Sequence, residues 1–177
     1  VEQSLTFGGL FLIPGLFGGV ILGERILRVY GPEFTQGAPV LSILILANLF
    51  MGYQNQLLNI LNAIDRPDLA FRVNVVFVVA NVLLNIVLIY LYGWVGAAVA
   101  TVTSVAISLV LAYGHVNGII DFNLPVIEIA RQWVAGAVMG IIVYGGLKVE
   151  ETYQVVGHNF AVVMILVILG AGVYFII

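Results

Sequence analysis

The chain alternates between long apolar runs and short segments that hold its charged residues. A transmembrane helix needs about 20 mostly apolar residues, and six runs meet that length. They cover residues 5–23, 37–64, 73–91, 93–114, 130–147 and 159–177. Every carboxylate lies outside these runs. The pattern therefore predicts an all-α integral membrane protein, built as a bundle of six transmembrane helices.

The composition supports hydrocarbon as the solvent. The chain is 62% hydrophobic and only 8% charged, whereas about a quarter of the residues in soluble domains are charged. So few charges could hardly cover the surface of a soluble protein of 177 residues. The sequence has no basic run, so nothing in it indicates a nucleic-acid partner. We expect a multi-pass membrane protein in contact with membrane lipid.

Amide side chains interrupt the second run, where the stretch YQNQLLNILN holds five of them. At 100° per residue, four asparagines share an arc of about 60° on this helix, while Gln54 and Gln56 point elsewhere. The four are Asn48, Asn55, Asn59 and Asn62. Asn81 and Asn85 form a second row with Asn74 in the third run. Amides in a bilayer face protein or water, so both rows should point inward.

Two interpretations of these rows remain open. Amides can hydrogen-bond between helices, where such bonds average about 0.6 kcal/mol. Alternatively, they can line a hydrophilic cavity that passes a sugar, because each amide offers donors and an acceptor to hydroxyl groups. The crowding between residues 53 and 62 exceeds what one packing face needs and favours a cavity there. The substrate-cavity candidates are Asn48, Gln54, Asn55, Gln56, Asn59, Asn62, Asn81 and Asn85.

Small residues recur at four-residue spacing in two of the runs. Gly15, Gly19 and Gly23 lie in the first run beside Pro14. The fourth run carries the row Gly96, Ala100, Ser104 and Ser108. Rows of this kind allow helices to approach closely, so we expect both to lie at helix–helix contacts.

Motifs for enzyme chemistry are missing from the sequence. It has no cysteine and no HExxH, Walker A or GxGxxG pattern. We therefore expect no catalytic residue, no metal site and no cofactor. No Asp, Glu, Lys or Arg lies in the middle of an apolar run. A proton or sodium relay normally needs such a group, so we expect none in this chain.

Three segments resemble a known transporter family. The segment RVYGPEFTQGAPVLSIL (28–44) resembles the link between the seventh and eighth helices of polysaccharide-exporting flippases. NAIDRPDLAFRVN (62–74) is similar to their loop between the eighth and ninth helices, and NVLLNIVLIYLYGWVGAAVAT (81–101) resembles their ninth and tenth helices. The chain is thus identified as a member of the multidrug/oligosaccharidyl-lipid/polysaccharide exporter superfamily, in its lipid-linked oligosaccharide flippase branch.

The resemblance implies one lobe of a two-lobed fold, with residues 1–177 as the C-terminal lobe and an N-terminal lobe absent from this chain. It implies alternating-access transport of a lipid-linked glycan across the cytoplasmic membrane, with both chain ends cytoplasmic. Flippases of this kind often carry basic residues in the cavity, and none is visible here in mid-membrane. Pyrophosphate recognition would therefore come from the other lobe or from Arg66 and Arg72 at the rim.

Two rival functions remain open. A multidrug exporter of the same superfamily would favour an apolar cavity with an acidic residue, which this chain lacks. A non-transporting membrane scaffold would tolerate apolar replacements along both asparagine rows.

Overall fold

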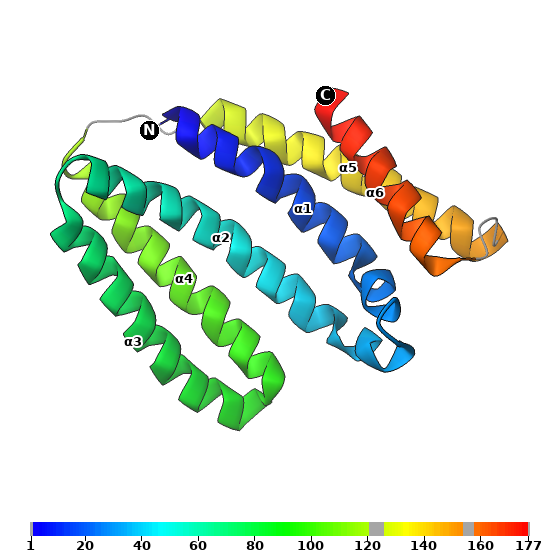
Figure 1. The fold of residues 1–177 in the computed structure, drawn as a ribbon, viewed down its shortest axis with the longest axis horizontal. Coiled ribbons are helices and arrows are strands. Elements are labelled where there is room, and N and C mark those ends of the chain that lie inside the picture. The colour runs from blue at the N-terminus through cyan, green and yellow to red at the C-terminus, as the bar shows by residue number, and fades with distance from the viewer. Residues whose placement is uncertain (1, 121–125, 154–157, 177) are drawn as a thin grey trace.

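The computed structural model describes residues 2–120, 126–153 and 158–176. These residues form a single slab of long helices (Figure 1). The elements are α1 (Glu2–Arg28), the 3₁₀ helix η1 (Pro32–Gly37), α2 (Ala38–Ala63), α3 (Pro67–Tyr92), α4 (Trp94–Asn117), α5 (Val126–Tyr153) and α6 (Asn159–Ile176). Six helical segments of the described chain are long and apolar enough to span a membrane, and the predicted fold class is confirmed.

The helices extend beyond the predicted apolar runs wherever local signals favour helix. Helix α3 begins six residues before the apolar run, with Pro67 in its first turn and Asp68 beside it. Proline suits the first helical position, and an acidic side chain there complements the helix dipole. Helix α1 continues to Arg28, with Arg25 and Arg28 in its last turn. Residue 177, the last of the sixth run, lies outside the described residues.

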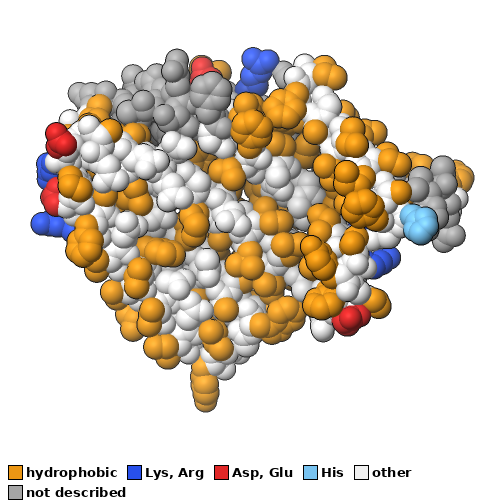
Figure 2. Space-filling view, in the orientation of Figure 1, with side chains coloured by type: hydrophobic (Ala, Val, Ile, Leu, Met, Phe, Trp, Pro, Cys, Tyr) orange, Lys and Arg blue, Asp and Glu red, His pale blue; other side chains and the backbone are white. Residues whose placement is uncertain are grey.

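Charged side chains gather at the two ends of the slab. Figure 2 shows them along its edges, with hydrophobic and uncharged surface between them. One end, here called the termini side, holds the described chain ends Glu2 and Ile176 and the α2–α3 link at Asp65. The other end holds the Gly31 and Gly93 turns. The chain is therefore a multi-pass membrane protein whose apolar belt separates two polar ends.

Helix order in space differs from helix order in sequence. Helix α4 packs against both α2 and α3, whereas α2 and α3 touch only where their link joins them. Helix α1 packs against α2, α5 and α6. The two asparagine rows lie on helices that are consecutive in sequence, α2 and α3. In the fold, α4 lies between these two helices along most of their length (Figure 1).

The two small-residue rows differ in how closely neighbouring helices pack against them. Every member of the α4 row lies at a helix–helix contact, because all four residues are buried: Gly96, Ala100, Ser104 and Ser108. In α1, a Cβ placed on Gly19 would lie 2.5 Å from Ile45 Cδ1 of α2, and one on Gly23 would lie 3.5 Å from Leu41 Cδ2. A Cβ on Gly15 would meet nothing within 4 Å. The predicted close contact therefore holds for two of the three α1 glycines and is wrong for Gly15.

Candidate functional site

The asparagine row of α2 lies on a face that no helix of the described chain covers. Asn48, Asn55, Asn59 and Asn62 are all exposed, and none of their side-chain amides makes a hydrogen bond within the described residues. The buried side of the same helix carries Leu57, Leu58 and Leu61, which pack against α3 and α4. The amides are thus separated from the packed core, and they do not hold these helices together.

The row is long enough to follow a chain of sugars. From Asn48 to Asn62 it rises about 21 Å along the helix, at 1.5 Å per residue. It begins in the middle of α2 and ends one residue before the helix terminus on the termini side. An unpaired amide costs free energy in hydrocarbon, so this face requires water, a polar ligand or another protein surface.

The two glutamines of the stretch do not belong to that row. Gln54 is buried, with 4% of its surface exposed, and lies on the packed side of α2. Gln56 is half-buried beside α1, where a Cβ on Gly8 would lie 3.7 Å from its Cγ. Both were predicted as cavity candidates. The structure assigns Gln54 to the helix packing and Gln56 to the α1–α2 contact, because their positions on the helix turn them away from the exposed face.

The second asparagine row binds to its own helix. The Asn85 side-chain nitrogen donates to the Asn81 backbone carbonyl at 2.8 Å and to the Asn81 side-chain oxygen at 3.1 Å. Both residues are half-buried. These bonds engage the Asn85 side-chain NH2 and the Asn81 side-chain oxygen within α3, as mid-helix Asn side chains can. The second row therefore forms no interhelical bond within the described residues.

The two rim arginines differ in whether a carboxylate already pairs with them. Arg66 Nε donates to Asp68 Oδ1 at 3.2 Å in an exposed ion pair. Arg72 is exposed on α3 and makes no ion pair among the described residues. A guanidinium already held by a carboxylate is less available to a phosphate, so Arg72 is the better placed of the two at the termini side.

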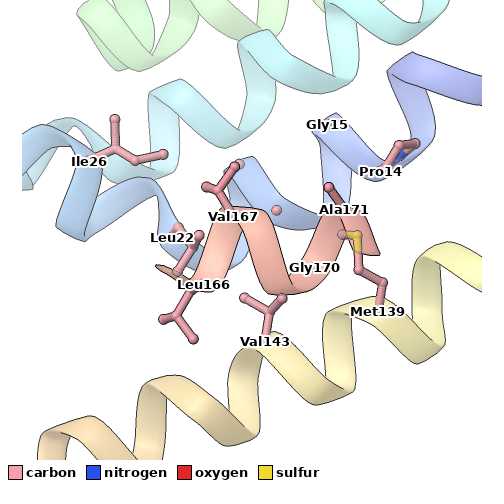
Figure 3. A pocket seen from close by; sticks show the side chains of 12 residues that line it. Pro14, Gly15, Leu22, Ile26, Met139, Val143, Leu166, Val167, Gly170 and Ala171 are labelled. Carbon is pink, nitrogen blue, oxygen red and sulfur yellow. The ribbon is translucent and has the colours of Figure 1, made fainter. Parts of the chain in front are cut away.

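An apolar groove of about 340 Å³ lies between α1, α5 and α6. Figure 3 shows Pro14 and Gly15 of α1 facing Gly170 and Ala171 of α6, with Met139 and Val143 of α5 beneath. No lining residue carries a polar side chain. The groove is open where Gly15 lacks a side chain, and its chemistry suits hydrocarbon rather than a glycan.

Sequence reasoning missed one polar cluster, formed by Tyr53 of α2, Gln132 of α5 and Tyr174 of α6. A Cβ on Gly9 of α1 would lie 2.6 Å from the Tyr53 hydroxyl and would overlap Gln132 Oε1. Gln132 and Tyr174 together line a cavity of about 300 Å³. The only signal in the sequence was one polar side chain on each of three apolar helices. Such a pattern does not reveal which side chains lie close together in the fold.

A family model described as "Lipid II flippase MurJ" matches residues 1–166. The chain is 33% identical over 177 residues to a Haloferax volcanii protein named "Probable flippase AglR", covering 98% of this chain and 36% of that protein. It is 32% identical over 146 residues to "Probable low-salt glycan biosynthesis flippase Agl15" from the same organism, covering 82% and 31%.

Two further matches are a protein from Vibrio cholerae and a solved structure. A Vibrio cholerae protein named "Probable lipid II flippase MurJ" is 25% identical over 189 residues, covering 97% of this chain and 34% of that protein. A structure of "Lipid II flippase MurJ, inward closed conformation" aligns with a TM-score of 0.83 at 20% identity, over 99% of this chain and 37% of the other. That likeness shows the fold alone. The chain spans about a third of the length of these relatives.

Proposed function

The chain belongs to the lipid II flippase MurJ family, and on that premise we propose that it is the C-terminal lobe of a two-lobed flippase for a lipid-linked oligosaccharide. The flippase works in the cytoplasmic membrane, and the other lobe covers the exposed face of α2 across a water-filled cavity. The two lobes rock to open this cavity to each side in turn. The protein is a transporter of the multidrug/oligosaccharidyl-lipid/polysaccharide exporter superfamily and carries out no covalent chemistry.

The observation that carries this proposal is the uncovered amide row of α2. Four amides without partners on one face of a membrane helix need a polar environment, and amides match sugar hydroxyls as donors and acceptors. In this mechanism Asn55 and Asn59 contact the glycan while the lipid tail stays in the bilayer. The name of one Haloferax relative, a probable low-salt glycan biosynthesis flippase, supports a glycan as cargo.

The proposal predicts that Asn55 is in contact with water and with substrate. This chain contains no cysteine, so Asn55→Cys can be labelled in the full-length protein after any cysteines elsewhere have been replaced. A membrane-impermeant maleimide should label Asn55→Cys, and added lipid-linked oligosaccharide should slow the labelling severalfold. Val78→Cys, on an exposed apolar stretch of α3, serves as the control and should label slowly with or without substrate. Unprotected labelling, or none, at position 55 contradicts the proposal.

The rim arginines provide a second prediction. Arg72→Ala should reduce glycan export about fivefold, which corresponds to losing roughly 1 kcal/mol of interaction with a phosphate. Arg66→Ala should have a smaller effect, because Asp68 already holds that guanidinium. Export in cells that depend on this flippase measures both variants. A larger loss for Arg66→Ala than for Arg72→Ala would show that the pyrophosphate is not met as proposed.

A further inference from the structure

Helices α4 and α5 leave a groove between them on the termini side. Among the described residues, no Cα atom of α4 lies within 8 Å of a Cα atom of α5. The groove has a volume of about 310 Å³, within the range of about 300–1,000 Å³ that is typical of small-molecule sites. Tyr53 and Leu57 of α2 form its floor, and its walls include Val110 of α4 and Trp133 of α5. The two walls therefore belong to helices whose backbones do not approach each other.

The groove opens on the face of the slab opposite the amide row. At 100° per residue, Tyr53 and Leu57 each lie about 160° around α2 from Asn55. Val110, which is 69% exposed, and Trp133, which is 40% exposed, lie at its mouth. The floor is closed, because Leu57 is only 2% exposed and the Tyr53 hydroxyl oxygen is fully buried. A ligand can thus enter from the outer surface but has no open path through the floor to the amides.

The groove reaches about as deep as one leaflet of a bilayer. Leu109, on its α4 wall, lies eight residues before the helix end at Asn117, which is about 12 Å at 1.5 Å per residue. Trp133 lies seven residues after Val126, where α5 begins, which is about 10 Å. One leaflet contributes about 15 Å to a hydrocarbon core about 30 Å thick. The groove therefore extends from the polar end of the slab into the leaflet on the termini side and not beyond it.

The lining of the groove suits hydrocarbon. None of its side chains carries a charge or an amide. Tyr113 of α4 and Trp133 of α5 supply one aromatic ring to each wall, and such residues gather where hydrocarbon meets the lipid headgroups. The Trp133 ring is held edge-to-face against Phe17 of α1, with the ring centroids 5.8 Å apart. The groove thus presents a fixed apolar surface at the depth where lipid chains begin.

The size of the groove distinguishes a lipid chain from a protein helix as its occupant. One turn of a helix, about 10 Å wide and about 5.4 Å long, fills roughly 420 Å³, which exceeds the 310 Å³ of the whole groove. A helix could therefore rest on the mouth but could not enter. A single hydrocarbon chain is much thinner and flexible, so it can fill the groove. There it gains dispersion contacts with the lining that an empty space would forfeit.

We propose that one hydrocarbon chain of a membrane phospholipid, from the leaflet on the termini side, occupies this groove and packs between α4 and α5. The ligand is a lipid of the bilayer and not the cargo, because the amide row lies on the opposite face of α2. The bound chain supplies the packing that these two helices do not give each other. The proposal goes beyond the proposed function and does not need it, so the tests below can fail while the flippase assignment stands.

Trp133 provides a built-in probe, because bromine on a lipid chain quenches tryptophan fluorescence on contact. The full-length protein in detergent keeps Trp133 as its one tryptophan, with Trp94 and any others replaced by phenylalanine, and is titrated with phosphatidylcholine brominated along its chains. We expect the quenching to saturate, because a single site fills. A matched protein that keeps only Trp94, which is 56% exposed at the other end of the slab, should show quenching that rises with lipid content without saturating.

The other outcomes of this titration overturn the proposal. Quenching of Trp133 that follows lipid content as it does for Trp94 would show contact with bulk lipid and no site. Absence of quenching at Trp133 would show that protein covers the groove. Excess unbrominated phosphatidylcholine should restore the Trp133 fluorescence, and failure to do so contradicts a reversible site. Stronger displacement by a polyprenyl phosphate than by phosphatidylcholine would show that the groove selects a carrier lipid instead.

A variant that fills the groove tests its position. Val110→Phe places a ring at the mouth, and overpacking of the site should raise the phospholipid concentration for half-maximal quenching of Trp133 at least about fivefold. Val78→Phe makes the same change on the exposed surface of α3, away from the groove, and should leave that concentration unchanged. Equal effects of the two substitutions would place the bound lipid elsewhere and overturn the proposal.

Discussion

Replacing Asn55 and Asn59 together with leucine should reduce export of the lipid-linked glycan at least about fivefold while the protein stays in the membrane at its normal level. Each amide lost removes hydrogen bonds worth about 0.5–1.5 kcal/mol to the sugar, and two such losses multiply. Both side chains are exposed and unbonded in the described residues, so their replacement should change folding stability by less than about 0.5 kcal/mol. Export in cells that depend on this flippase, with quantitative immunoblotting of membranes, measures both quantities.

The matched control keeps the amides. Asn55→Gln with Asn59→Gln retains an amide at both residues, one methylene further from the backbone, and should preserve most of the export. Normal export by the leucine pair would show that these amides do not contact the substrate. A loss of export that only follows a loss of protein would show that the row is needed for folding instead.

The largest effect on stability is expected from Gly96→Ala at the start of α4. A Cβ there would overlap the Leu88 carbonyl of α3, which is backbone and cannot turn away. The α3–α4 hairpin must therefore open, at a cost of about 1–3 kcal/mol or more for overpacking. The expected result is a lower Tm of the purified protein and a lower amount in the membrane.

Gly145→Ala is the matched control for this variant. Gly145 lies within α5, and a Cβ there would meet nothing within 4 Å. Alanine should therefore be neutral or stabilise the helix by up to about 1 kcal/mol. A Gly96→Ala protein as stable as the Gly145→Ala protein would contradict the close packing of α3 on α4.

The apolar pattern of the sequence was enough to predict the helices. A segment that crosses hydrocarbon must hydrogen-bond its backbone N–H and C=O groups internally, and a helix does so. Periodicity also placed Asn48, Asn55, Asn59 and Asn62 on one face of α2, and the structure leaves that face uncovered. Helix ends were harder to predict, since α3 starts with Pro67 and Asp68 outside the apolar run. Hydropathy does not register capping signals of this kind.

Contacts between helices could not be predicted, because periodicity fixes a face of one helix and not its neighbour. Gln54 looks like another cavity amide in sequence, and its burial depends on how the neighbouring helices pack around α2. Asn81 and Asn85 share a face as predicted, but they bond within α3. The meeting of Tyr53 and Gln132 depends on glycine at position 9 of α1, because a side chain there would overlap both.

A reconstituted flipping assay tests the central claim most directly. The full-length protein is placed in lipid vesicles that carry a labelled lipid-linked oligosaccharide, and a membrane-impermeant glycosidase reports how much of it becomes accessible from outside. We expect the protein to accelerate transfer between leaflets well above the rate in protein-free vesicles, and the Asn55→Leu/Asn59→Leu protein to lose most of that acceleration. Transfer no faster than in protein-free vesicles would contradict the account.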